Sequence, residues 1–120
     1  MAHSIISTFN FGDGNGPVPA KRHINPDGTE GGWVANTATV AATAYVGPDA
    51  QVYGNARVFD NARVFGKARV SGNAWVYGLV DYKARVDGFA RVYGGALVCG
   101  DAYVTGDAVV TGIISHGTHK

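Results

Sequence analysis

The chain is poor in cysteine, because Cys99 is its single one. One thiol cannot close a disulfide within the chain or supply a cysteine-based zinc site. Charge of either sign is also scarce: 10 Lys and Arg oppose 9 Asp and Glu, for a net charge of +1. A balance this even disfavours strong attraction to a long nucleic acid. Stability must therefore come from packing within the chain.

Long hydrophobic runs are missing as well. No stretch approaches the roughly 20 apolar residues that a membrane helix needs. Residues 1–4 lack the charged and apolar regions of a signal peptide. With 46% hydrophobic residues in 120, the composition is that of one globular domain. The sequence thus predicts a cytoplasmic protein with no membrane contact.

Glycine, in contrast, is abundant, at 18 of 120 residues, and it recurs at a fixed step of six. A valine begins each unit, a glycine or another turn former follows two residues later, and an alanine follows four residues later. The valines that mark the repeat are Val34, Val40, Val46, Val52, Val58, Val64, Val70, Val76, Val86, Val92, Val98, Val104 and Val110. The unit is Val-x-Gly-x-Ala-x, and internal repeats of this kind predict a solenoid.

A period of six excludes a helix, whose apolar face repeats near 3.6, and it excludes a simple alternating strand of period two. A short strand around each valine, a turn at each glycine and a small alanine at the inner corner explain all three fixed positions. Three such sides close one coil, so the chain stacks on itself every 18 residues, about 4.8 Å higher. The sequence predicts an all-β parallel β-helix over residues 33–114.

The runs at 54–58 (GNARV) and 72–76 (GNAWV) resemble the bacterial hexapeptide-repeat family. The resemblance covers about two thirds of the chain. It implies a left-handed coil, which is an exception to the usual right-handed parallel crossover. It also implies a tendency to form homotrimers. Because repeats report only stacking, the resemblance says little about function.

Two residues are missing from the repeat after Val76, beside Leu79. We interpret this break as a tight corner that the coil tolerates. The alternative is a notch that shapes a binding groove. If the short side still completes its coil, outward residues fall into columns at steps of 18, or of 16 across the break.

Three unequal faces result from this sorting. One face, which we call the Arg/aromatic face, displays Arg57, Phe59, Trp75, Tyr77, Arg91 and Tyr93. A second face shows Gln51, Tyr53, Arg69, Arg85, Asp87 and Tyr103, and the third shows Tyr45, Arg63, Phe65 and Leu97 beside the short corner. We take the Arg/aromatic face, together with Arg63, Arg69 and Arg85, as the candidate ligand-binding or interface residues.

Exposed aromatics interleaved with arginine have three explanations. The favoured one is packing between the subunits of a homotrimer, since both residue types are enriched in protein interfaces. The second is a stacking platform for a nucleotide or sugar in clefts between subunits, with arginine on rings or on an anionic group. The third is stacking between coils with no partner at all.

Enzymes of the hexapeptide-repeat family act as acyltransferases or as carbonic anhydrases, and both use histidines within the coils. Such an imidazole serves as general base or as metal ligand. Here His3, His23, His116 and His119 all lie outside residues 33–114. The resemblance therefore points to a catalytically silent branch, and we expect no enzyme activity, no catalytic residue, no metal and no cofactor.

Both ends of the chain differ from the repeat. Residues 1–32 are expected to cap the first coil, with a strand at 5–11 and a turn-rich link after it, because a bare solenoid end exposes unpaired strand edges. Trp33 is expected to cover the first layer. Residues 115–120 are expected to be a flexible tail, although His116 and His119 could chelate a metal if they were helical.

Lys21, Arg22 and His23 form a cationic run within the expected cap. Capping alone is the favoured interpretation. The alternative is an anion-binding edge that reaches a neighbouring subunit.

The sequence as a whole predicts a noncatalytic hexapeptide-repeat homotrimer that acts as a structural or binding module. The alternative is a protein that binds or sequesters a small anionic molecule, such as a nucleotide or sugar, with arginine and aromatic side chains between subunits. An acyltransferase-like enzyme is less favoured.

Overall fold

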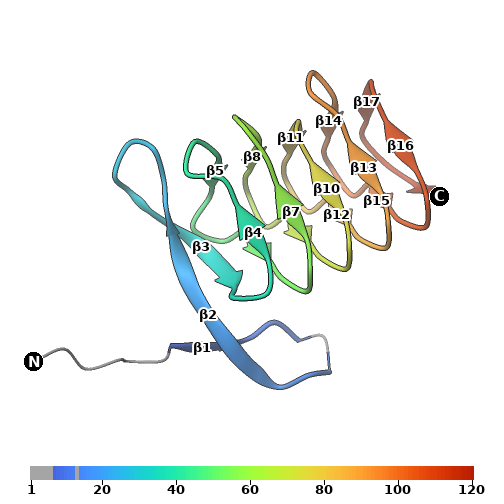
Figure 1. The fold of residues 1–120 in the computed structure, drawn as a ribbon. Helices are drawn as coiled ribbons and strands as arrows, with labels where there is room; N and C mark the ends of the chain where they lie inside the picture. Colours follow the sequence, from blue (N-terminus) through green and yellow to red (C-terminus); the bar gives the residue numbers. More distant parts are fainter. Residues whose placement is uncertain (1–6, 13) are drawn as a thin grey trace, which may run out of the picture.

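The computed structural model describes residues 7–12 and 14–120. This part of the chain contains strands and turns but no helix. Short strands stack in parallel from coil to coil and form a three-sided solenoid of five coils (Figure 1). The predicted all-β parallel β-helix is therefore confirmed, while its left hand stays a prediction from the family resemblance.

Three sheets make up the sides of the solenoid in the described residues. Sheet I contains β1 (Thr8–Asn10), β2 (Pro17–Ile24), β3 (Glu30–Ala35), β6 (Gln51–Val52), β9 (Arg69–Val70), β12 (Arg85–Val86), β15 (Tyr103–Val104) and β18 (Thr118–His119). Sheet II contains β4 (Thr39–Val40), β7 (Arg57–Val58), β10 (Trp75–Val76), β13 (Arg91–Val92) and β16 (Val109–Val110). Sheet III contains β5 (Tyr45–Val46), β8 (Arg63–Val64), β11 (Leu79–Val80), β14 (Leu97–Val98) and β17 (Ile113–Ile114).

The core is a column of valines that stack in register. Val76, for example, lies between Val58 and Val92 on the neighbouring coils, and its side chain is fully buried. Burial of one such side chain contributes about 1.5–3 kcal/mol. Alanines such as Ala74 fill the inner corners, where only a small side chain fits, and they are buried too. The predicted interior is confirmed.

Glycines at one corner form a ladder that needs their missing Cβ. Gly54, Gly72 and Gly88 all have positive φ, and a Cβ at Gly72 would lie 2.8 Å from the backbone nitrogen of Gly88. Positive φ favours glycine because it strains other residues. Glycine is therefore required at this turn for two reasons: the backbone has positive φ, and the next coil leaves no space for a Cβ.

The coil absorbs the two-residue break at the corner between β10 and β11. Gly78 O accepts a hydrogen bond from Arg63 N (3.1 Å), and Leu79 N donates to Ala96 O (3.0 Å), so pairing continues above and below. The same short corner recurs between β16 and β17, where Gly112 O accepts a hydrogen bond from Leu97 N of β14 (2.9 Å). A single break was predicted from the valines, and this second one went unseen because an isoleucine replaces valine there.

The N-terminal segment extends sheet I beyond the first coil. β2 pairs antiparallel with β3, and β1 pairs antiparallel with β2. Trp33 does not cover the first layer as expected. Because it alternates with the inward Val34, it points outward, where it stacks on Phe9 with 5.0 Å between ring centroids. The expected strand at 5–11 is found as Thr8–Asn10, and Ile5 and Ile6 lie outside the described residues.

The C-terminal end differs from the expected flexible tail. Thr118–His119 form β18 and pair in parallel with Tyr103–Val104. Positive φ at Gly117 turns the chain back onto the stack, and Gly117 O accepts a hydrogen bond from Tyr103 N (2.8 Å). The coil therefore runs to residue 119 instead of ending at 114.

Candidate functional site

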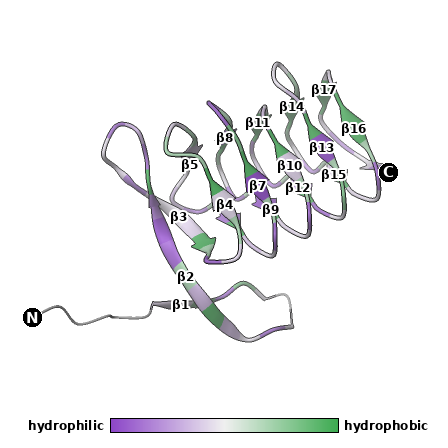
Figure 2. Cartoon of the chain, viewed as in Figure 1, coloured by the Kyte–Doolittle hydropathy of each residue, from purple (hydrophilic) through white to green (hydrophobic). Residues whose placement is uncertain are grey.

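The Arg/aromatic face is built on β7, β10 and β13 of sheet II. Each of these strands buries its valine, so the preceding residue must point outward. Trp75 lies directly between Arg57 and Arg91 in the register of the sheet. Figure 2 shows hydrophilic colour in β7 and β13, on either side of β10, and hydrophobic colour in the neighbouring strand β16.

A hollow of about 300 Å³ lies beside this column. Its lining residues are Asn55, Arg57, Asn73, Trp75, Phe89 and Arg91. The guanidinium carbon of Arg91 lies 4.6 Å from the centre of the Trp75 ring, in a cation–π contact. Among the described residues, neither Arg57 nor Arg91 forms an ion pair with a carboxylate. Two cations thus flank one indole, and among the described residues no acidic side chain is paired with either of them.

The second outward column of the face has a different character. Phe59 and Tyr77 stack with 4.5 Å between ring centroids, and Tyr77 and Tyr93 stack at 6.0 Å. The Phe59 ring also meets the edge of Trp75 at 5.9 Å. These rings pack against one another, and this stacking stabilises neighbouring coils. The column therefore supports the wall of the hollow and does not line it.

Arg69 and Arg85 lie on sheet I, in register with each other and on a different side of the solenoid from Trp75. Arg85 stacks on Tyr103 at 5.1 Å, and the Tyr103 hydroxyl donates to a carboxylate oxygen of Asp87 (3.0 Å). Because both arginines sit on another sheet, they cannot join the ligand-binding set around Trp75.

Arg63 lies on sheet III, at the short corner. A cavity of about 400 Å³ opens there, with Asn61, Tyr77, Leu79 and Leu97 among its lining residues. The missing residues leave this space between the longer corners of the coils above and below. The break thus forms both the tolerated corner and the notch that the sequence left as alternatives.

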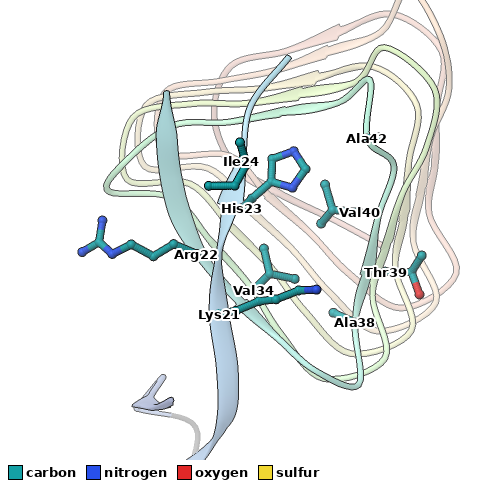
Figure 3. A pocket seen from close by; sticks show the side chains of 9 residues that line it. All are labelled: Lys21, Arg22, His23, Ile24, Val34, Ala38, Thr39, Val40 and Ala42. Atoms are coloured by element: carbon teal, nitrogen blue, oxygen red, sulfur yellow. The ribbon is translucent and has the colours of Figure 1, made fainter. Parts of the chain in front are cut away.

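The cationic run of the cap lies at the N-terminal end of the solenoid. A hollow of about 440 Å³ there is lined by Lys21, Arg22, His23, Ile24, Val34, Ala38, Thr39, Val40 and Ala42. Figure 3 shows the side chains of Lys21 and His23 reaching from β2 toward Val40, whereas Arg22 points away. The alternation of side chains along a strand explains this split.

Two of the three cationic side chains already have partners. Arg22 lies 3.8 Å from the Glu30 carboxylate and 5.2 Å from the Trp33 ring centre. His23 Nε2 donates a hydrogen bond to Ala44 O (2.8 Å). The three side chains therefore do not form one anion-binding site. Lys21 faces the hollow, whereas Arg22 points to the other side of β2.

Asn25 is a residue whose role the sequence did not reveal. Its side chain is buried, accepts a hydrogen bond from Val46 N (2.9 Å) and donates to Val46 O (3.2 Å). The side-chain amide thus pairs with β5 as a peptide group of a neighbouring strand would. The sequence predicted a turn after Asn25, and the hydrogen bond from Gly28 N to Asn25 O (2.9 Å) confirms it. A turn motif does not predict which distant residues a side chain contacts, so the pairing of Asn25 with Val46, 21 residues away, was missed.

Metal ligands are not gathered at any of these places. Among the described residues, no group of three or more His, Cys, Asp or Glu side chains lies close enough to hold a metal ion. His119 Nε2 instead donates to His116 O (2.9 Å). Within the same residues, no helix is long and apolar enough to cross a membrane.

In a comparison with known families, the family described as "YdcK Beta solenoid repeat" matches residues 50–66, a short part of the chain. These residues span β6, β7 and β8, which form nearly one coil. No curated protein and no solved structure matches the chain. Together with the stacked parallel coils, the match shows a β-solenoid that fits a hexapeptide-repeat-like β-helix family.

Proposed function

We propose that the chain is a noncatalytic, homotrimeric binding module whose Arg57–Trp75–Arg91 column holds a small anionic ligand with a planar group. One observation carries the proposal: two exposed guanidiniums without an acidic partner among the described residues flank an indole beside a hollow of about 300 Å³. Exposed, unpaired cations around an aromatic ring suit an anion that also stacks.

The chemistry of the column fits a nucleoside monophosphate or a sugar phosphate. Guanidinium groups offer paired donors that match phosphate oxygens. Trp75 offers a flat apolar surface to a base or a sugar ring. Asn55 and Asn73 line the same hollow and can both donate and accept hydrogen bonds. A volume near 300 Å³ is at the small end of ligand pockets, so a small ligand is proposed.

Exposed apolar side chains support the proposed trimer. Phe89 is 62% exposed beside the hollow, and Val109 and Ile113 are 58% and 75% exposed on the last coil. Association between subunits would remove these apolar side chains from water, which is favourable. A neighbouring subunit that covers Phe89 would also close the open side of the hollow.

Removal of both guanidiniums is expected to abolish most of the ligand affinity. In a Trp33→Phe background, where Trp75 is the one tryptophan left, adenosine monophosphate should quench the fluorescence. Arg57→Ala combined with Arg91→Ala should weaken its Kd by about 100-fold, because each charged hydrogen-bonding group contributes about 1.5 kcal/mol or more. Native mass spectrometry of the same samples should give three times the chain mass of 12.5 kDa.

The matched control is Arg63→Ala, which removes an exposed arginine from sheet III and should leave the affinity unchanged. Equal binding by the double variant, or loss of binding by the control, would contradict the proposed site. Dissociation of the trimer in the double variant would instead identify Arg57 and Arg91 as interface residues. A monomeric wild type would contradict the proposed assembly.

A further inference from the structure

Within the stack, the carbonyl groups of each coil are bound by the coil before it. On sheet II, Ala56 O accepts from Thr39 N (3.0 Å) and Val58 O accepts from Ala41 N (2.9 Å). Sheet III repeats the pattern with the carbonyls of Ala62 and Val64, which accept bonds of 3.0 and 2.7 Å. The first coil has no coil before it, so its equivalent groups need other partners.

Two sides of the first coil find those partners in the cap. On sheet I, β2 pairs with β3 from Ala20 to Ile24, with a register shift between Arg22 and Ile24. On sheet III, Ala44 O accepts from His23 Nε2, while both Val46 N and Val46 O pair with the Asn25 side chain. Two side chains therefore form the hydrogen bonds with β5 and the residue before it that the backbone of a preceding strand would otherwise form.

The third side is left open. Ala38 O, Val40 O and Val40 N are the equivalent groups of β4, and none has a hydrogen-bond partner within residues 7–12 and 14–120. The hollow of about 440 Å³ lies directly beside this edge (Figure 3). Val34 and Val40 form its apolar floor, and Lys21 and His23 stand over it. An unpaired strand edge is a template for another strand.

We propose that the edge of β4 binds an extended acidic peptide as an added parallel strand. Two peptide N–H groups would donate to Ala38 O and Val40 O, and the carbonyl between them would accept from Val40 N. The side chain between the two donors would then point inward, onto the floor formed by Val34 and Val40. This mode combines main-chain hydrogen bonds with a pocket for one side chain.

Charge and space both select this occupant. Lys21 faces the hollow and no Asp or Glu lines it, so carboxylates on either side of the apolar residue would be attracted. Arg22 adds little to this attraction, because it points away and pairs with Glu30. A second copy of the chain is a poorer fit. β1 and β2 project beyond the first coil, so a whole coil cannot stack on this end, whereas a single strand can reach β4 (Figure 1).

The test uses a labelled probe, fluorescein-tagged Asp-Thr-Val-Thr-Asp with a blocked C-terminus, titrated with the full chain and followed by fluorescence anisotropy. Its valine and both aspartates would face inward, and its threonine N–H groups would donate to Ala38 O and Val40 O. A probe with N-methyl groups on both threonines keeps the charge but cannot donate. It should bind at least 10-fold more weakly, and so should a probe with lysine in place of both aspartates.

Substitutions in the protein test the same binding edge independently of changes in the probe. Val40→Pro removes an N–H that bonds nothing in the described chain, at an edge where proline is tolerated, and should weaken probe binding at least 10-fold. Lys21→Glu should do the same by reversing a charge. Lys67→Glu, at a distant exposed corner, is the matched control and should bind like the wild type. Circular dichroism checks that each variant is folded.

Three results would overturn the proposal. The first is no binding of the Asp-Thr-Val-Thr-Asp probe at millimolar protein. The second is equal binding of the N-methylated probe, since attraction would then be purely electrostatic. The third is concentration-dependent self-association, seen by sedimentation velocity and abolished by Val40→Pro, without probe binding, which would assign the edge to a second copy. If Val40→Pro fails to fold, the N-methylated probe and Lys21→Glu still decide.

Discussion

Replacement of Gly32 by alanine is expected to lower the free energy of unfolding by about 3 kcal/mol or more. A Cβ at Gly32 would overlap the backbone oxygen of Ala50 and lie 2.6 Å from Gly47 O. Both obstacles are backbone atoms of the first coil, so no side-chain rotation can relieve them. The variant must push β3 away from β6 and thereby loosen the cap.

Gly94→Ala is the matched control for this prediction. A Cβ added at Gly94 would have no other atom within 4 Å, and the φ of Gly94 is not positive, so its replacement should change stability by less than about 1 kcal/mol. Thermal unfolding followed by circular dichroism measures both variants. The Gly32 variant should melt about 10 °C or more below the wild type. Equal melting of the two variants would show that the cap does not approach the first coil this closely.

Val76→Asp is expected to have the largest effect of all, because it places a carboxyl group in the middle of the valine column. Val76 is fully buried between Val58 and Val92, and no polar group of the column could pair with the new carboxyl. An unpaired buried charge costs several kcal/mol, a large share of the stability of a domain this size. The variant should lose its β-sheet signal in circular dichroism at pH 7.

The expected pH dependence gives a second test of this variant. Burial favours the neutral acid, so its pKa in the folded state is raised above that in the unfolded state. Stability is then greater below the unfolded-state pKa and falls as the pH rises through the folded-state value. The variant should therefore recover structure between pH 7 and pH 4. Val109→Asp, whose original side chain is 58% exposed, is the control and should stay folded throughout.

The sequence was a good guide wherever a residue type repeated. Valine spacing predicted the core column, its register and the face on which Arg57, Trp75 and Arg91 meet. Such inference succeeds because each coil repeats the backbone geometry of the last, so a step of 18 or 16 places the outward residues as far as Ile113. The last pairing, of Tyr103 with Thr118, departs from these steps. The second short corner at Gly112 escaped because the marker there is Ile114.

The ends of the solenoid were harder to predict, since no repeat constrains them. A cationic run at 21–23 suggested one anion-binding edge, yet strand alternation sends Arg22 to Glu30 on the opposite side. Asn25 pairs with Val46, which is 21 residues away, and only the path of the cap determines that contact. The open edge of β4 is likewise a property of the assembled first coil.

Amide hydrogen exchange of the unliganded protein, resolved by residue with NMR, tests most directly whether the first coil is capped on two sides and open on the third. The Val46 amide, which donates to Asn25 Oδ1 (2.9 Å), should exchange slowly, as should buried amides inside the stack. The Val40 amide, which has no acceptor in the described chain, should exchange fast. A Val40 amide as well protected as that of Val46 would contradict the open edge.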